Sequence, residues 1–320
     1  FHPHPATPAS VASRGLGDVY KRQMLIDSAR QFTEEVLYPR EDEVETSDRV
    51  STELKAWIIG KAKEYGFYAA NMPEDLGGGG LDTVSLTLFE RELGRASFAL
   101  QYLVGRPSNI LQACTGAQRE RYLLPCIRGE KIDCLAMTEP GAGSDLRSMV
   151  CRADADGDEF VINGTKHFIS HADIADFVIL FASTGEETTS RGVRKRISAF
   201  LIDKGTKGFS VRSGYRSVSH RGYHNSILEF ENCRVPASQM LGAKDQGFQV
   251  ANDWLGAPRL QVAALCLGTA PRALELAPHN VRINLVVPHA STRSEGDTLV
   301  TRIPGEVPAS SGRTNVSVTG

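Results

Sequence analysis

A ten-residue segment near the middle of the chain carries groups that could bind an anionic cofactor. Residues 136–145 (AMTEPGAGSD) place a hydroxyl at Thr138, a flexible bend at Gly141 and Gly143, and a second hydroxyl at Ser144. Glycines let backbone N–H groups approach a phosphate closely, and successive N–H groups in such a bend form an anion-binding nest. The pattern alone is compatible with many loops, so its meaning depends on what surrounds it.

The other reactive side chains form no metal or disulfide pattern. The six cysteines include no CxxC pair, which favours a reducing compartment and buried thiols. Histidines lie four residues apart at the ends of 167–171 and of 220–224, but neither pair belongs to an HExxH motif. We therefore predict no metal site. We also expect Glu139 and Asp145 to bond nearby backbone N–H groups rather than to act as paired catalytic acids.

Charge and hydropathy exclude two classes of partner. Lys and Arg total 36 against 38 Asp and Glu, a formal charge of −2, which argues against a nucleic-acid-binding protein. The apolar runs, such as 177–182, are far shorter than the roughly 20 residues of a membrane-spanning helix. One local basic stretch, 212–224, contains Arg212, Arg216 and Arg221. It could contact phosphates, but a solvated loop is the favoured interpretation, and 192–196 (GVRKR) is expected at an exposed hairpin tip.

The spacing of apolar residues predicts helices first, then strands, then one long helix. Helical periods occupy 25–37 (ending at Pro39), 54–65, 83–93 and 116–125, and a glycine-rich run within 72–82 forms a turn, since no GK[ST] follows it. Strand-like runs occupy 160–162, 177–181, 197–202 and 227–230, and Asn163-Gly164 predicts a hairpin turn that leads into a second strand ending at Ile169. Helical spacing returns over 248–276. The fold class is α+β, with a middle β-barrel or sandwich.

Five segments follow from this order. Residues 1–23 are expected to be a disordered, non-matching extension, either foreign or, less favoured, a transit peptide. Residues 24–135 form a helical domain, 136–243 a β domain, and 244–277 a long helix. Residues 278–320 form a tail that fits neither pattern.

Several segments together resemble the acyl-CoA dehydrogenase family over about residues 24–277. The string 136–145 is similar to the family's signature. MPEDLGGGGLD (72–82), QRERYLLPCIRGE (118–130), NGTKHFIS (163–170), FENCRVPASQMLG (230–242) and LGAPRLQVAALCLGTAPRALELA (255–277) resemble further family segments in the family's order.

The resemblance implies FAD bound between the β domain and a C-terminal helical bundle, of which this chain holds the first helix. Leu135, Met137, Thr138, Gly143 and Ser144 would line the flavin. Ser144 would also lie near CoA, as would Arg259. Phe168, Ile169 and Ser170 replace the family's Trp-Ile-Thr, so that Ser170 would face the reactive ring nitrogen. Phe168 would either cover the ring or belong to the β-domain core.

The family reaction removes the proton alpha to an acyl-CoA carbonyl while a hydride passes from the beta carbon to FAD. The usual catalytic Glu would lie beyond residue 277, and Pro258 stands at the alternative position before Arg259. From there ALELAPHNVRINLVVP (273–288) resembles short-chain dehydrogenases/reductases, but neither TGxxxGxG nor YxxxK occurs. We therefore expect a truncated or chimeric acyl-CoA dehydrogenase. The alternatives are a non-catalytic remnant and, less favoured, an NAD(P)-dependent reductase.

The resemblance also implies an electron-transfer flavoprotein as partner and a homo-oligomer for the intact family member. It implies a cytoplasmic location in a bacterium, or the mitochondrial matrix otherwise. We expect Pro258 and Pro271 to interrupt the last helix. Its apolar residues Val262, Leu265, Leu267 and Leu274 should face water or partner subunits.

Overall fold

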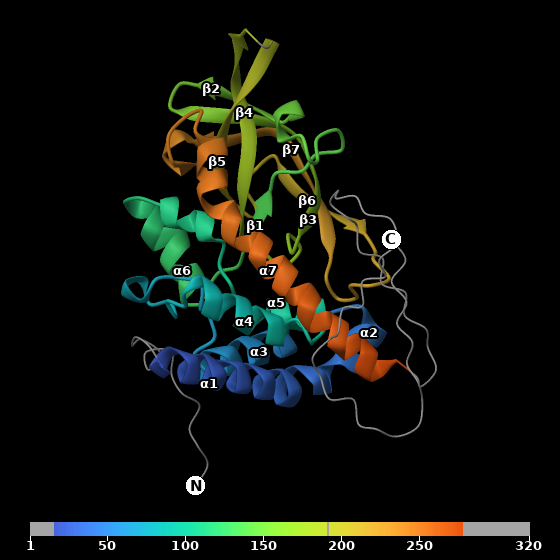
Figure 1. Ribbon diagram of the computed structural model, residues 1–320. Helices are drawn as coiled ribbons and strands as arrows, with labels where there is room; N and C mark the ends of the chain where they lie inside the picture. Colours follow the sequence, from blue (N-terminus) through green and yellow to red (C-terminus); the bar gives the residue numbers. More distant parts are fainter. Residues whose placement is uncertain (1–15, 191, 278–320) are drawn as a thin grey trace, which may run out of the picture. The chain divides into compact units, whose positions relative to one another are not determined.

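The computed structural model describes residues 16–190 and 192–277 (Figure 1). Residues up to Thr269 form one compact unit, and the second unit begins at Ala270, within the last helix. The first part is helical, as predicted. Its α-helices are α1 (Leu16–Phe32), α2 (Glu41–Ser47), α3 (Thr52–Glu64), α4 (Thr83–Leu93), α5 (Phe98–Tyr102) and α6 (Leu124–Ile127).

Short helical turns join these helices. A π-helical turn at Thr33–Leu37 is followed by 3-10 turns at Tyr38–Arg40, Glu74–Leu76 and Asn109–Ala113, and a second π-helical turn spans Arg119–Leu123. The chain therefore winds on past Pro39, since proline fits the first turn of a helix. Side-chain caps define two starts: Ser51 accepts the Leu54 N–H, and Asp82 accepts those of Val84 and Ser85.

The prediction that residues 1–23 are disordered is wrong for residues 16–23. Helix α1 begins at Leu16, so residues 16–23 are helical, while residues 1–15 lie outside the described part of the chain. The physical reason is local composition, because the prolines of the extension all lie within its first eight residues and none follows before Pro39.

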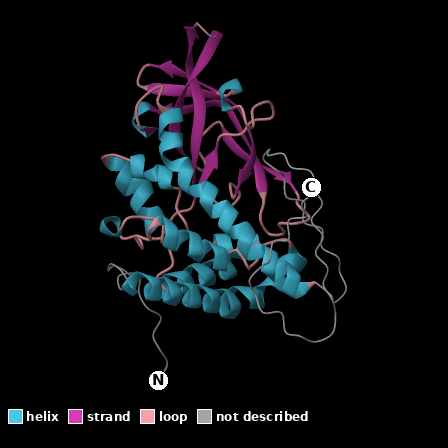
Figure 2. Cartoon of the chain, viewed as in Figure 1, coloured by secondary structure: helices cyan, strands magenta, loops and turns pink. Residues whose placement is uncertain are grey.

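The middle part is one eight-stranded sheet in the order β6-β7-β3-β2-β4-β5-β8, with β1 paired to β4. Figure 2 draws these strands in magenta and the helices in cyan. The strands are β1 (Asp133–Ala136), β2 (Arg152–Asp156), β3 (Glu159–Ser170), β4 (Phe177–Thr189), β5 (Gly192–Asp203), β6 (Phe209–Tyr215), β7 (Asn225–Pro236) and β8 (Met240–Leu241), with 3-10 turns at Leu146–Ser148 and Ala237–Gln239. The sheet curls, because the rings of Phe160 on β3 and Phe200 on β5, three strands away, lie 5.1 Å apart. One face of β4 and β5 therefore encloses the β-domain core, and the other packs on helical residues.

The predicted hairpin at Asn163-Gly164 is wrong. Strand β3 runs unbroken from Glu159 to Ser170, and its pairing with β7 shifts register between Ile162 and Gly164, as at a β-bulge. Gly164 has φ +149°, and a Cβ there would lie 2.6 Å from Cys151 Cα. Glycine is needed at position 164 because the Cys151 backbone lies too close for any side chain. The sequence Asn-Gly alone does not distinguish such a close contact within a strand from a hairpin turn.

The last helix, α7 (Gly247–Leu276), is continuous, so the predicted interruption at Pro258 and Pro271 is wrong. A proline removes one backbone hydrogen bond, but the helix continues where neighbouring turns are packed, as Leu265 is against Gly94 and Gly268 against Arg91. The expected exposure also fails at one residue. Val262, Leu267 and Leu274 are exposed, but Leu265 is buried against Gly94, where any side chain would clash with its carbonyl. The predicted tail, residues 278–320, lies outside the described residues.

No helix in the described ranges is long and apolar enough to cross a membrane.

Candidate functional site

The predicted cofactor turn and the end of strand β3 lie side by side. The His167 N–H donates to the Thr138 carbonyl at 2.8 Å, and the Lys166 ammonium donates to the Met137 carbonyl at 2.9 Å. The turn is closed on itself by hydrogen bonds between the backbones of Glu139 and Ala142. Two segments about 30 residues apart in sequence are thereby held as one surface.

A buried ion pair fixes this arrangement. Lys166 and Glu139 are both 0% exposed, and their side chains meet at 2.7 Å. Glu139 also accepts the N–H groups of Val150 at 2.7 Å and Cys151 at 3.1 Å, as predicted for a carboxylate in this bend. The pair therefore joins the turn, β3 and the entrance to β2. Burial lowers the pKa of Lys166, and the Glu139 carboxylate opposes that effect.

Lys166 was not among the sequence-predicted site residues. Its signal was present, however, because Lys166 is in phase with the apolar Phe160 and Ile162 along the strand, on a face where a charge must find a partner. Asp145 accepts a bond from the Ser148 hydroxyl at 2.6 Å.

The turn presents an open, hydrogen-bonding edge. Gly143 and Ser144 are exposed, and a side chain added at Gly141 or Gly143 would meet nothing within 4 Å. Thr138 is half-buried. Leu135 and Met137 pack against the core on the helical side of the sheet. The edge thus offers backbone N–H groups and hydroxyls with room in front of them, which suits a phosphate-bearing group.

Phe168 is not part of the β-domain core. It is 53% exposed and adopts φ +54°, a left-handed conformation that is uncommon for an aromatic residue. Its ring stacks on Tyr215 with centroids 4.7 Å apart, and the Tyr215 hydroxyl bonds His167 at 2.6 Å. Backbone strain of this kind persists only where neighbouring residues hold it. The Phe168 ring thereby presents a flat aromatic surface to the outside.

The next two residues point in different directions. Ile169 is buried in the β-domain core, so only its backbone can serve a ligand. Ser170 is half-buried, and its hydroxyl donates to the Asn225 side-chain oxygen at 3.0 Å. The structure therefore brings together Thr138, Gly143, Ser144, Phe168 and Ser170 on neighbouring segments.

Arg259 is not joined to this group. It is exposed on α7, one residue after the half-buried Pro258. Within the described part of the chain, no hydrogen bond or ion pair links Arg259 to the turn.

No cluster of three His, Cys, Asp or Glu side chains that could hold a metal occurs among the described residues. Five of the six cysteines are buried, and burial raises the pKa of Cys233 to about 11, which keeps this thiol protonated.

Sequence models of one family match both parts of this architecture. The model described as "Acyl-CoA dehydrogenase, N-terminal domain" matches residues 21–130, and the model described as "Acyl-CoA dehydrogenase, middle domain" matches residues 134–233. The 3-(aryl)acrylate reductase of Clostridium sporogenes is 33% identical over 262 residues, which cover 80% of this chain and 67% of that protein. The chain belongs to the acyl-CoA dehydrogenase family.

Two relatives that are named acyl-CoA dehydrogenases show how much of a family member this chain covers. The mitochondrial short-chain specific acyl-CoA dehydrogenase of Bos taurus is 33% identical over 260 residues, 80% of this chain but 61% of that enzyme. The structure of a glutaryl-CoA dehydrogenase from Mycobacterium smegmatis in complex with FADH2 superposes with a TM-score of 0.68 at 26% identity, covering 79% of this chain and 63% of that one. The chain thus spans about three fifths of these two relatives.

The basic stretch 212–224 contacts the helical domain, although the side chains of Arg212 and Arg216 remain largely exposed. The Gly222 N–H donates to Asp48 at 2.9 Å, and the Arg221 guanidinium donates to the Glu45 carbonyl at 2.5 Å. His224 bonds Asp173 at 3.1 Å, and Arg212 pairs with Glu229 within the sheet. The Gly222 hydrogen bond lowers the pKa of Asp48. The stretch therefore fastens the β domain to the helical domain.

Behind the turn, a second polar cluster lies between the helices and the sheet. Arg106 is paired with the buried Glu90 at 2.7 Å and donates to the Gln101 side chain at 2.6 Å. Burial raises the pKa of Glu90 despite the arginine. His171 stacks on Tyr102 with centroids 3.2 Å apart, and burial, with Arg106 nearby, holds its pKa well below the usual 6.5.

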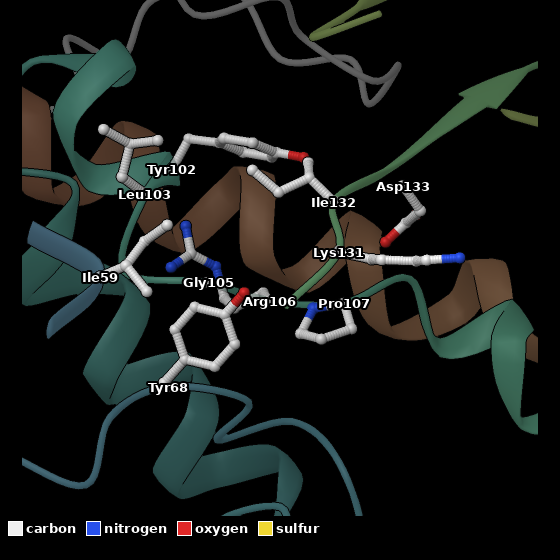
Figure 3. Close-up of a pocket in the computed structure, with 10 residues that line it drawn as sticks. All are labelled: Ile59, Tyr68, Tyr102, Leu103, Gly105, Arg106, Pro107, Lys131, Ile132 and Asp133. Atoms are coloured by element: carbon white, nitrogen blue, oxygen red, sulfur yellow. The ribbon is translucent and has the colours of Figure 1, made fainter. Parts of the chain in front are cut away.

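This Arg106 cluster (Glu90, Arg106 and His171) borders two cavities. One, of about 20 Å³, is lined by Tyr68, Tyr102, Arg106 and Asp133 and has room for a water molecule (Figure 3). The other, of about 250 Å³, is lined in part by Tyr102 and His171. Sequence analysis missed the cluster, although Glu90 occupies a core position of the 83–93 helix between Leu86 and Leu93, where a carboxylate calls for a partner.

Proposed function

We propose that this chain binds FAD and forms the flavin side of an enzyme that oxidises an acyl-CoA thioester between its alpha and beta carbons. The observation that carries the proposal is the attachment of the 137–144 turn to β3 beside Phe168 and Ser170. It joins an open phosphate-binding edge, a flat aromatic surface and a half-buried hydroxyl. FAD, when bound, supplies the acceptor for the hydride, and the protein supplies orientation and hydrogen bonds.

Each proposed contact matches the chemistry of its residue. The N–H groups and hydroxyl around Gly143 and Ser144 would hold the pyrophosphate, and Thr138 would bond the polar edge of the ring system. Phe168 would cover one face of the ring, while Ile169 contributes backbone only. Leu135 and Met137 support the turn through their packing on the helical side. Ser170 would place its hydroxyl near the reactive ring nitrogen.

The proposed substrate is an acyl-CoA thioester, with Ser144 and Arg259 as candidate contacts for CoA. We assign no catalytic base among the described residues, since proline stands at position 258. That residue is also the observation that favours the second candidate, a family member that binds flavin but does not turn over. The resemblance of 273–288 to short-chain reductases falls mostly outside the described residues, and no other feature supports it.

Family membership extends the proposal to partners. The electron acceptor would be an electron-transfer flavoprotein, and the whole protein would be a homo-oligomer. It would act in the bacterial cytoplasm or, for a eukaryotic source, in the mitochondrial matrix.

The first test is FAD affinity. Loss of one hydrogen bond to a bound ring costs about 1.4 kcal/mol, so Thr138→Val should raise the Kd for FAD about tenfold. Thr87→Val is the matched control, because Thr87, like Thr138, is half-buried, and its hydroxyl bonds the Thr83 carbonyl on α4. Titration of the purified chain with FAD, followed by flavin fluorescence, measures both. Equal Kd values for the two variants, or no binding by the unmodified chain, would contradict the proposed site.

The second test separates the two candidate functions. An acyl-CoA added without oxygen should bleach the flavin absorbance of a dehydrogenase. A flavin-bound chain that stays yellow with a panel of acyl-CoA thioesters, yet bleaches with dithionite, would be the non-catalytic form.

A further inference from the structure

The hydroxyl of Ser170 already has a partner for its proton. Ser170 and Asn225 face each other in the β3–β7 pairing, and the Ser170 hydroxyl donates to the Asn225 side-chain oxygen at 3.0 Å. A serine hydroxyl has one proton and two lone pairs. With the proton directed at Asn225, only lone pairs remain for any other group that approaches Ser170.

The surroundings of Asn225 hold this arrangement in place. Its backbone lies so close to Gly214 that a Cβ there would be 1.9 Å from the Asn225 carbonyl oxygen. Asn225 is also paired with Tyr215 on β6, so its backbone is held between two neighbouring strands. The side chain that accepts the Ser170 proton is therefore carried by a backbone that is fixed on both sides.

We propose that Asn225 is a positioning residue that makes Ser170 a hydrogen-bond acceptor toward the flavin. The proposal rests on the proposed FAD site. The reactive ring nitrogen of a flavin is an acceptor in the oxidised form and carries an N–H in the two-electron-reduced form. An accepting Ser170 therefore stabilises reduced FAD and not oxidised FAD, which raises the midpoint potential of the bound cofactor.

The sign of the change in midpoint potential tests whether Ser170 accepts from the reduced ring or donates to the oxidised ring. Ser170→Ala removes an acceptor of the reduced ring, so the ratio of reduced to oxidised FAD at a given potential should fall about tenfold. This corresponds to a midpoint potential about 30 mV lower for a two-electron couple. If Ser170 instead donated to the oxidised ring, the same substitution would raise the potential. Anaerobic equilibration of the FAD-loaded chain with a reference dye measures the shift without turnover.

Asn225→Ala tests the positioning role. It frees the Ser170 proton to turn toward the oxidised ring and stabilise it, so the potential should fall, in the same direction as in Ser170→Ala. In the double variant Ser170→Ala/Asn225→Ala, the second substitution should add nothing, because Asn225 acts through Ser170. Ser210→Ala, at an exposed serine on β6, is the control and should leave the potential unchanged.

The outcomes distinguish the proposed role of Asn225 and Ser170 from the proposed FAD site itself. A wild-type chain that does not bind FAD contradicts both. A chain that binds FAD, but whose potential is unchanged or higher in Ser170→Ala, overturns only the role of Ser170 as an acceptor. An Asn225→Ala variant that fails to fold leaves the sign of the Ser170→Ala shift as the deciding measurement.

Discussion

Two buried ion pairs in this molecule differ in how completely their oxygens are used. In the Glu139–Lys166 pair, both carboxylate oxygens accept backbone N–H groups, and the lysine also bonds a carbonyl. In the Glu90–Arg106 pair, one oxygen of Glu90 is buried without a hydrogen-bond partner. A fully bonded buried pair fixes geometry, whereas a partly bonded one retains a polar group whose desolvation is not offset. The first pair lies under the proposed cofactor turn, where fixed geometry is needed.

The largest expected effect comes from breaking the complete pair. Lys166→Met leaves Glu139 buried without its cation and should lower the free energy of unfolding by about 3–5 kcal/mol. Urea denaturation followed by circular dichroism measures the loss. The double variant Lys166→Met/Glu139→Gln should recover part of it, since no charge then remains buried. A single variant that loses less than about 1 kcal/mol would show that the pair does not hold the turn.

The second prediction compares one substitution at both glutamates. Glu139→Gln places an amide NH2 against backbone N–H donors and removes the counter-charge of the buried Lys166, so it should cost about 3 kcal/mol. Glu90→Gln can direct its amide to the position of the unpartnered oxygen and should change stability by less than about 1 kcal/mol. Parallel urea titrations at neutral pH give both values. Equal costs, or the reverse order, would show that unequal hydrogen bonding does not distinguish the two pairs.

The smallest expected effect is a pH dependence in the Arg106 cluster. The pKa of His171 is lowered in the folded state, so below about pH 6.5 the unfolded chain binds a proton that the folded chain does not. This contribution to stability is complete above pH 6.5 and decreases as pH falls, by at most about 1.4 kcal/mol per pH unit. His171→Phe keeps a ring against Tyr102 and should remove the dependence.

Thermal unfolding at pH 7.5 and 5.5 compares this variant with the wild type. A wild-type loss on acidification no larger than that of His171→Phe would mean that His171 does not resist protonation.

The fold was largely predictable, because its signals are local. The helices around 54–65 and 83–93 and the strands at 177–181 and 197–202 follow from apolar spacing, and each appears where expected. The failures share one cause. Asn163-Gly164 and the prolines of α7 are turn or breaker signals that packing overrides, since the cost of a local misfit is small beside the burial of a long strand or helix.

The candidate site was less predictable from the sequence than the fold. Thr138, Ser144 and Ser170 were identified through motifs, but their partners Lys166 and Asn225 were not. No periodicity links residue 139 to 166 or 170 to 225, because those contacts depend on how β3 lies against the turn and β7. Local sequence identifies groups that can bond, whereas the direction of each bond depends on distant neighbours.

The amino-acid order by itself determined the succession of helical, β and helical parts, the glycine-hydroxyl turn and the family to which the chain belongs. These are properties of short segments, set by side-chain spacing and backbone freedom. Only the tertiary structure decided that Phe168 is exposed, that Ile169 is buried and that the Ser170 proton is directed at Asn225. Those facts depend on the curl and register of the sheet, which are set by the packing of residues far apart in the chain.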